Sequence, residues 1–146
     1  MKIFLGSDHG GFELKRELEK FLAEKFPEFE IFDLGCDSAE SCDYPQFGRA
    51  VAEEVLKNEN SRGIVICGSG VGISIAANRV AGARAVLANS VELSNLGRQH
   101  NDANILALGG RTKFYDPWQK IVETFLTTDV DPAERHARRR DQLDNF

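Results

Sequence analysis

Residues 63–72 read GIVICGSGVG, an apolar run that passes directly into a glycine-rich turn. The first five residues are almost wholly apolar, which is typical of a parallel strand covered on both faces. The turn should open a helix that runs to about Val80. A strand, a glycine-rich turn and a helix in this order predict the repeating unit of an α/β fold.

The same alternation of apolar runs and helical patterns continues on both sides of this unit. The expected strands are Lys2–Ser7, Glu30–Leu34, Gly63–Cys67, Arg84–Leu87 and Ile105–Leu108. Helical spacing follows each strand, with Asp43, Ser90 and Asp116 as expected helix starts, and a charged helix or tail begins at Pro132. We therefore predict one Rossmann-like three-layer αβα domain over residues 1–146, built on a five-stranded parallel sheet.

Composition narrows the function classes. The 146 residues carry 18 Lys and Arg against 23 Asp and Glu, a net charge of -5, which argues against a general nucleic-acid binder. The apolar start MKIFLGS is short and is followed by Asp8 and His9, so neither a signal peptide nor a membrane span is expected. We expect a cytoplasmic protein.

Three cysteines, Cys36, Cys42 and Cys67, form no CxxC pair. Neither a disulfide framework nor a structural zinc site is therefore expected. Cys67 is distinct because it ends a predicted strand at the turn Gly68–Gly72. Amides at a helix start favour negative charge, and glycines let the backbone approach an anion, so a thiolate there could serve as base or nucleophile.

Other interpretations of this turn stay open at this point. A cysteine that ends a buried strand is often an inert apolar residue. A dinucleotide site is disfavoured, because the spacing is GxGxG rather than GxGxxG and the next strand ends in Ala88-Asn89-Ser90, without an acidic residue. The P-loop lysine is also missing.

Three further polar segments are candidates. Asp8-His9 follows the first strand, although a helix cap and a surface histidine would look the same. Residues 98–102, RQHND, are by themselves typical of a solvated loop. Residues 134–140, ERHARRR, place Arg135 and Arg139 four apart on one helix face, where two guanidinium groups could hold a phosphate dianion.

His100 poses a geometric problem for any shared site. It precedes the fifth strand and so belongs at the amino end of the sheet, opposite Cys67. A five-residue strand separates these ends by roughly 16 Å. A symmetric dimer could bring His100 of one chain to the glycine turn of the other.

Four segments carry a family resemblance: GSDHGGFELK, DYP, GIVICGSGVGISIAANR and RQHNDANILALGGR. Together they resemble the type B ribose-5-phosphate isomerase family, which includes galactose-6-phosphate isomerase subunits, from Met1 to about Arg139. The resemblance implies that Cys67 is the catalytic base and that His100 opens the furanose ring. Ile73 stands where another branch has a glutamate base, and Ser69 where many members have threonine.

The resemblance also implies the substrate contacts. It assigns the substrate phosphate to His9, Arg135 and Arg139. The remaining implied binding residues are Asp8, Gly68, Ser69, Gly70, Val71, Gly72, Asn101 and Arg111. The sites of the family lie at a dimer interface, and some members are tetramers.

The expected activity is an aldose–ketose isomerase that interconverts ribose 5-phosphate and ribulose 5-phosphate through an enediolate. It requires no cofactor, no metal, no nucleic acid and no membrane. A hexose 6-phosphate substrate, such as galactose 6-phosphate or allose 6-phosphate, stays open. So does a non-catalytic sugar-phosphate-binding protein, whereas a thiol redox protein is disfavoured without a CxxC partner.

Overall fold

A computed structural model describes residues 1–145, which build one five-stranded parallel sheet in the order β2-β1-β3-β5-β4. The strands are β1 (Lys2–Ser7), β2 (Glu30–Asp33), β3 (Ser61–Cys67), β4 (Ala85–Leu87) and β5 (Ile105–Gly109). All five predicted strands are confirmed, with ends that differ by at most two residues. The strand order reverses between β1 and β3, which places their carboxyl ends side by side.

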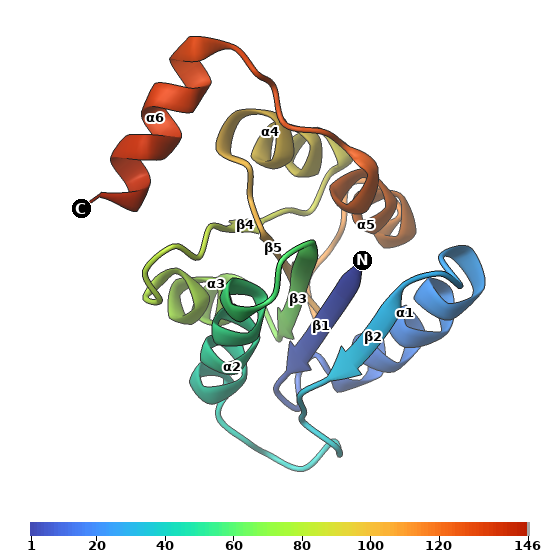
Figure 1. Cartoon of the computed structure of the whole chain (residues 1–146). Helices are drawn as coiled ribbons and strands as arrows, with labels where there is room; N and C mark the ends of the chain where they lie inside the picture. Colours follow the sequence, from blue (N-terminus) through green and yellow to red (C-terminus); the bar gives the residue numbers. More distant parts are fainter. Residues whose placement is uncertain (146) are drawn as a thin grey trace.

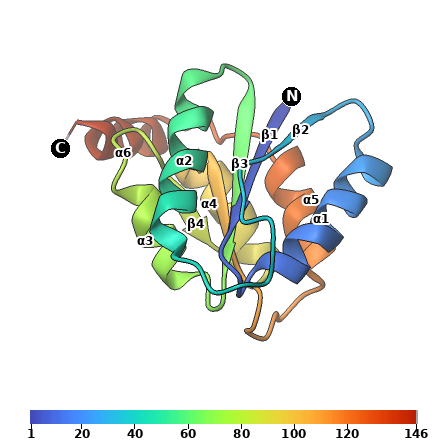
Figure 2. The ribbon, with the colours of Figure 1, turned by 90° about the horizontal axis from the view of Figure 1, so that it is seen from below.

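Helices cover both faces of this sheet. They are α1 (Phe12–Lys25), α2 (Tyr44–Lys57), α3 (Val71–Asn78), α4 (Val91–Asn101), α5 (Trp118–Thr127) and α6 (Glu134–Asp144). Figures 1 and 2 show α1 and α5 on one side of the strands and α2 and α3 on the other, with α6 reaching out beyond α4. The predicted three-layer αβα fold is confirmed. Within residues 1–145, no helix has the length and apolar character that a membrane crossing needs.

Alternation along β3 divides the core between the two faces. Ile64 and Ile66 pack in the cluster that contains the apolar residues of α1 and α5. Val65 and Cys67 pack in the other cluster, with the apolar residues of α2 and α3. Burying side chains of this size contributes about 1.5–3 kcal/mol each. The thiol of Cys67 therefore points toward the α2 and α3 layer.

One helix cap and one helix start differ from the sequence prediction. Asp43 is the N-cap residue of α2, but its side chain accepts no hydrogen bond there. Asp116 does not cap α5, where Pro117 is the N-cap residue; its carboxylate instead accepts a hydrogen bond of 2.7 Å from the amide of Val91 in α4. The tertiary fold brings this loop to the start of α4, a proximity that local sequence does not reveal. Ser90 caps α4 as predicted, accepting from the Leu93 amide at 3.2 Å.

The strand β4 lies at an edge of the sheet, and one side chain covers part of that edge. The amide group of Asn78 accepts a hydrogen bond of 2.8 Å from the Ala85 N–H and donates one of 2.9 Å to the Ala85 carbonyl. These two backbone groups point away from β5, toward the open side of the sheet. Asn78 therefore satisfies them as a neighbouring strand would.

Candidate active site

The turn after β3 holds Cys67 in a backbone cradle. Its Sγ accepts a hydrogen bond of 3.1 Å from the amide of Gly70, the N-cap residue of α3. Gly70 has a φ of 78°, and a Cβ there would lie 2.5 Å from Cδ1 of Leu87. Only glycine fits this conformation and this space. The fold thus aims an amide and the N-terminus of α3 at the sulfur.

Three more amides of this turn are open to a ligand. Within residues 1–145, the N–H groups of Gly68, Ser69 and Gly72 have no hydrogen-bond partner. The Val71 amide is satisfied locally by the hydroxyl of Ser69, at 3.2 Å. Unpartnered amides at the start of a helix are suited to an anion or to a developing oxyanion.

The loop after β1 lies against this turn. A Cβ on Gly10 would lie 2.9 Å from the Gly68 nitrogen, so the two loops meet at their backbones. Asp8 is 7% exposed, and its Oδ1 accepts hydrogen bonds from the amides of Gly10 and Gly11, at 2.8 and 3.1 Å. Asp8 thus shapes the entry to α1 beside the cradle.

The side chain of His9 points from this loop toward Cys42, in the segment that links β2 to α2. Its Nδ1 lies 3.2 Å from both the nitrogen and the carbonyl oxygen of Cys42. Burial raises the pKa of the Cys42 thiol, and a hydrogen bond with the Cys36 thiol raises it further. His9 is therefore positioned by the segment that links β2 to α2.

A buried lysine braces the same segment. Lys15 is 1% exposed, and its Nζ donates to both carboxylate oxygens of Asp33, at 2.5 and 2.6 Å, and to the Cys36 carbonyl at 2.7 Å. Asp33 also accepts from the Gly35 amide at 2.9 Å. All three ammonium protons are used, so this charge is compensated where it is buried.

Arg111 and Tyr44 complete the carboxyl-end group. The Arg111 amide donates to the Gly68 carbonyl at 2.9 Å, which fixes its exposed side chain beside the turn. Sequence analysis did not select Tyr44, yet a Cβ on Gly72 would lie 2.5 Å from its Cζ and 2.9 Å from its hydroxyl. The DYP segment was the available signal, because it places Tyr44 at the first residue of α2.

A cavity of about 260 Å³ opens beside this turn, lined by Ser69, Leu87, Ala88, Asn89, Leu93, Gly109, Thr112 and Lys113. Cys67 is 4% exposed and is not among the lining residues. Its neighbours Ser69 and Gly109 are, and Gly109 pairs with Cys67 across β3 and β5. Cys67 therefore adjoins this cavity through its neighbours and does not line it.

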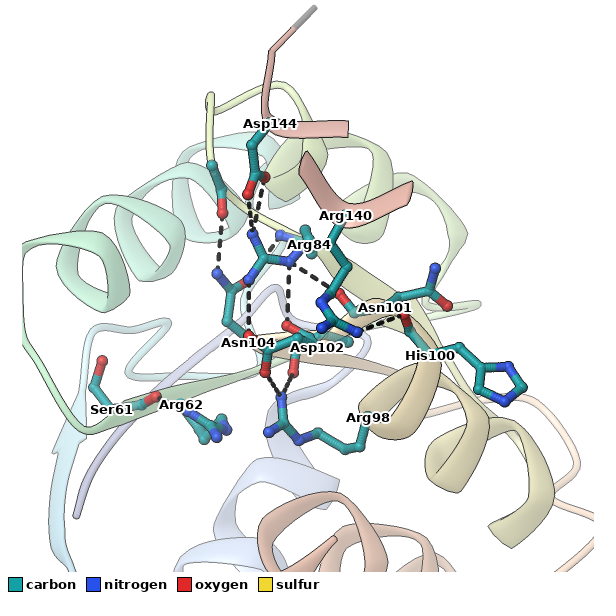
Figure 3. Close-up of polar contacts among 12 residues, drawn as sticks. Ser61, Arg62, Arg84, Arg98, His100, Asn101, Asp102, Asn104, Arg140 and Asp144 are labelled. Atoms are coloured by element: carbon teal, nitrogen blue, oxygen red, sulfur yellow. Dashed lines mark hydrogen bonds and ion pairs between the residues drawn. The ribbon is translucent and has the colours of Figure 1, made fainter. Parts of the chain in front are cut away.

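The remaining predicted site residues lie at the opposite end of the sheet. His100 and Asn101 form the last turn of α4, just before β5 begins. Arg135 and Arg139 are exposed on α6. Figure 3 shows Arg140 donating to the His100 carbonyl, at 3.3 Å, and Arg84 paired with Asp102 and Asp144. These contacts fasten α6 to the end of α4.

A larger cavity, of about 550 Å³, lies at this second end. Its lining residues are Asn78–Val86, Asn101, Ala103, Leu143 and Asp144. It contains Asn101 but neither Cys67 nor any residue of the glycine turn.

The predicted site residues thus form two groups in one chain. The carboxyl-end group comprises Asp8, His9, Cys67, Gly68, Ser69, Gly70, Val71, Gly72 and Arg111. The amino-end group comprises His100, Asn101, Arg135 and Arg139. Cys67 is level with the last residue of β5, and His100 precedes its first, as the sequence argument expected.

Comparisons with known proteins identify the family to which the chain belongs. Ribose-5-phosphate isomerase B of Escherichia coli is 44% identical over 138 residues, which cover 94% of this chain and 91% of that protein. The enzyme of the same name from Mycolicibacterium paratuberculosis is 42% identical over 147 residues, covering 100% and 91%.

Solved structures are equally similar. Ribose-5-phosphate isomerase B of Clostridium thermocellum has a TM-score of 0.92 and 48% identity, covering 99% of this chain and 96% of that one. A ribose 5-phosphate isomerase of Thermotoga maritima has a TM-score of 0.92 and 43% identity, covering 99% and 98%. The family model described as ribose/galactose isomerase matches residues 3–143. The chain belongs to the ribose/galactose isomerase family.

Proposed function

We propose that this protein interconverts ribose 5-phosphate and ribulose 5-phosphate in the cytosol. The observation that carries the proposal is the thiol of Cys67, whose sulfur accepts a hydrogen bond from the Gly70 amide in a turn that holds three further open amides. A base beside an anion cradle is what proton abstraction next to a carbonyl requires. Relatives that cover the whole length of this chain bear the name ribose-5-phosphate isomerase B.

The chemistry is a proton transfer between neighbouring carbons. The thiolate of Cys67 removes the proton from C2 of the open-chain aldose, and the electron pair of that C–H bond forms the C1–C2 double bond. O1 takes up the negative charge, which the open amides of Gly68, Ser69 and Gly72 stabilise. One such donor is typically worth about 2.7–4 kcal/mol of barrier.

The second half of the reaction returns a proton from the Cys67 thiol to the neighbouring carbon. O1 gains a proton and O2 loses one, so that C2 becomes the carbonyl carbon while the Cys67 thiol protonates C1. One residue serves both half-steps. His100 opens the sugar ring before this sequence, and His9, Arg135 and Arg139 hold the phosphate far from the reacting carbons, where their binding energy serves orientation.

The two groups of site residues come together in a homodimer. His100 and the arginines of one chain meet the glycine turn of its partner across a shared interface. Support comes from exposed apolar side chains on α3, β4 and α4, namely Val71, Ile75, Leu87 and Leu93, which are 37–59% exposed. Apolar side chains gathered on adjacent elements mark an interaction surface.

Replacement of the base tests the activity. Cys67→Ala is expected to lower kcat for ribose 5-phosphate by about 10²–10⁴-fold while substrate binding, measured by calorimetry, is retained. Cys36→Ala is the matched control, because it removes a second buried thiol, which lies near Ser7, Ser38 and Cys42 and outside the glycine turn. Near-normal turnover by Cys67→Ala would refute the base assignment.

The substrate is tested with a panel of sugar phosphates. Turnover should be highest for ribose 5-phosphate, ahead of galactose 6-phosphate and allose 6-phosphate. Preference for a hexose phosphate would correct the substrate while leaving the chemistry intact. Binding without turnover of any sugar phosphate would identify a sensor instead of an enzyme.

Subunit mixing tests the shared site. Inactive Cys67→Ala and His100→Ala proteins are mixed under conditions that exchange subunits. Each mixed dimer contains one native site, made from Cys67 of one chain and His100 of the other, so about a quarter of wild-type activity should return. A mixture that stays inactive although mixed dimers are present would place both residues in a single chain.

A further inference from the structure

The ring of His100 does not stand alone at the end of α4. His136, in the first turn of α6, stacks on it, with ring centroids 4.1 Å apart and planes inclined by 8°. His136 is 5% exposed, whereas His100 is only partly buried. The buried ring thus forms a platform beneath the ring that faces outward.

Asp131 lies beside the buried ring of His136. Nε2 of His136 is buried without a hydrogen bond among the described residues and lies 3.6 Å from Oδ2 of Asp131. Asp131 is itself held, because its Oδ1 accepts from the Ala133 amide at 2.8 Å and its own amide donates to the Gln99 carbonyl at 2.9 Å. The backbone of Asp131 is therefore bonded to the helix that carries His100, and its carboxylate lies beside the His136 ring.

A second fastening comes from Arg140. Its Nη1 lies 3.3 Å from the His100 carbonyl and 3.4 Å from the Asp131 carbonyl, and donates to both. Figure 3 shows this guanidinium beside the end of α4. The backbone of His100 is thus held by one residue of α6 and its ring by another.

The charges around His136 favour its neutral form. Burial lowers its pKa, and the neighbouring His100, Arg135 and Arg139 lower it further, while Asp131 opposes them. The amide of Ala133 lowers the pKa of Asp131, so that group stays a carboxylate. A neutral ring beneath His100 places no like charge against it when His100 takes up a proton.

We propose that His136 is a positioning residue for the reaction: its stacked ring fixes the plane in which His100 meets the sugar ring. This inference rests on the proposed function, in which His100 opens the furanose. The role of His136 can be tested apart from the isomerase activity, because ring opening and proton transfer can be measured separately. Ribose 5-phosphate is a closed ring in solution, whereas ribulose 5-phosphate cannot form a furanose, because its 5-hydroxyl is esterified.

The experiment uses both sugars. Turnover of ribose 5-phosphate reports ring opening together with proton transfer. Exchange of the C1 hydrogen of ribulose 5-phosphate with deuterium from ²H₂O reports proton transfer alone. Both rates are measured for wild type, His136→Ala, His136→Phe and Gln142→Ala, the last a control at an exposed position of the same helix.

His136→Ala should lower ribose 5-phosphate turnover by on the order of 10- to 100-fold, the effect of a misplaced catalytic group. Deuterium exchange into ribulose 5-phosphate should stay within about twofold of wild type, since uncoupled proton transfer does not need the ring placement. His136→Phe keeps a flat ring and should restore most turnover. Gln142→Ala should change neither rate.

Three results would overturn the assignment. One is undiminished aldose turnover in His136→Ala. Another is a parallel fall of turnover and exchange, which would indicate that α6 as a whole had lost its place. The third is a His136→Phe protein as impaired as His136→Ala. Failure of the wild-type protein to interconvert ribose 5-phosphate and ribulose 5-phosphate would instead refute the proposed function itself.

Discussion

At the carboxyl end of β1 and β3, backbone groups make most of the polar contacts of the site, whereas at the amino end of β4 and β5 long charged side chains make them. The first end depends on amides and on a glycine with a φ of 78°. The second depends on Arg84, Asp102 and Arg140 reaching between α4 and α6. The geometry of the carboxyl end therefore depends on steric fit, and the geometry of the amino end depends on the balance of charges.

Substitution of the N-cap glycine of α3 tests the steric half of this comparison and should have the largest effect. A Cβ at Gly70 would lie 2.5 Å from Leu87 Cδ1 and 2.8 Å from the carbonyl carbon of Leu108, in a conformation unfavourable for alanine. We expect Gly70→Ala to lower the free energy of unfolding by about 2–5 kcal/mol. Urea unfolding measures this loss.

The matched control is Gly82→Ala. Gly82 also has a positive φ, of 86°, but a Cβ there would meet only the flexible side chain of Leu56, at 3.2 Å. Its loss should be about 1 kcal/mol, from the conformation alone. Equal losses at the two positions would show that the close contacts of Gly70 with Leu87 and Leu108 do not contribute to the loss of stability.

Removal of the buried lysine asks whether the carboxyl end also relies on a side chain. Lys15→Met leaves Asp33 without its partner, although the Asp33 side chain is 32% exposed and regains some hydration. We expect a loss of about 2 kcal/mol in unfolding free energy, below the usual cost of breaking a fully buried pair. The exposed pair of Arg49 and Glu53 supplies the control, where Arg49→Met should cause no measurable loss.

Acid sensitivity tests the amino end and should give the smallest effect. The pKa of His136 is lower in the folded protein than its ordinary value of 6.5, so the unfolded chain binds more protons near that pH. Stability from this residue is complete above about pH 6.5 and falls as the pH drops toward the folded pKa. His136→Phe should therefore lose less stability than wild type between pH 7 and pH 5.

Thermal unfolding at both pH values provides the measurement. Asp131 does not affect the comparison between pH 7 and pH 5, because the pKa of its carboxyl is lowered from 3.8 and its contribution to stability changes only in more acidic solution. An unchanged difference between wild type and variant at the two pH values would show that His136 does not couple folding to protons.

Sequence patterns were sufficient for the fold because each strand carries its own apolar run and each helix its own stripe. The turn at Cys67 was equally readable, since its glycines, its thiol and the following helix are contiguous. The separation of His100 from Cys67 followed from strand direction alone. All of these features depend on order along the chain.

Residues whose roles arise from tertiary contacts were not predictable. Tyr44 reaches the glycine turn only because α2 packs on α3, and Lys15 is buried only because Asp33 and Cys36 converge on it. Asp116 stabilises α4, a helix that precedes it in the chain. Local sequence patterns do not predict these tertiary contacts.

The amide of Asn78 on Ala85 bears on how copies of this chain can associate. With those backbone groups satisfied, β4 offers a second copy little of the ladder by which sheets merge or fibres grow. Contacts between copies on this side must then be made by side chains of the flanking helices. Such contacts can select one partner and one orientation.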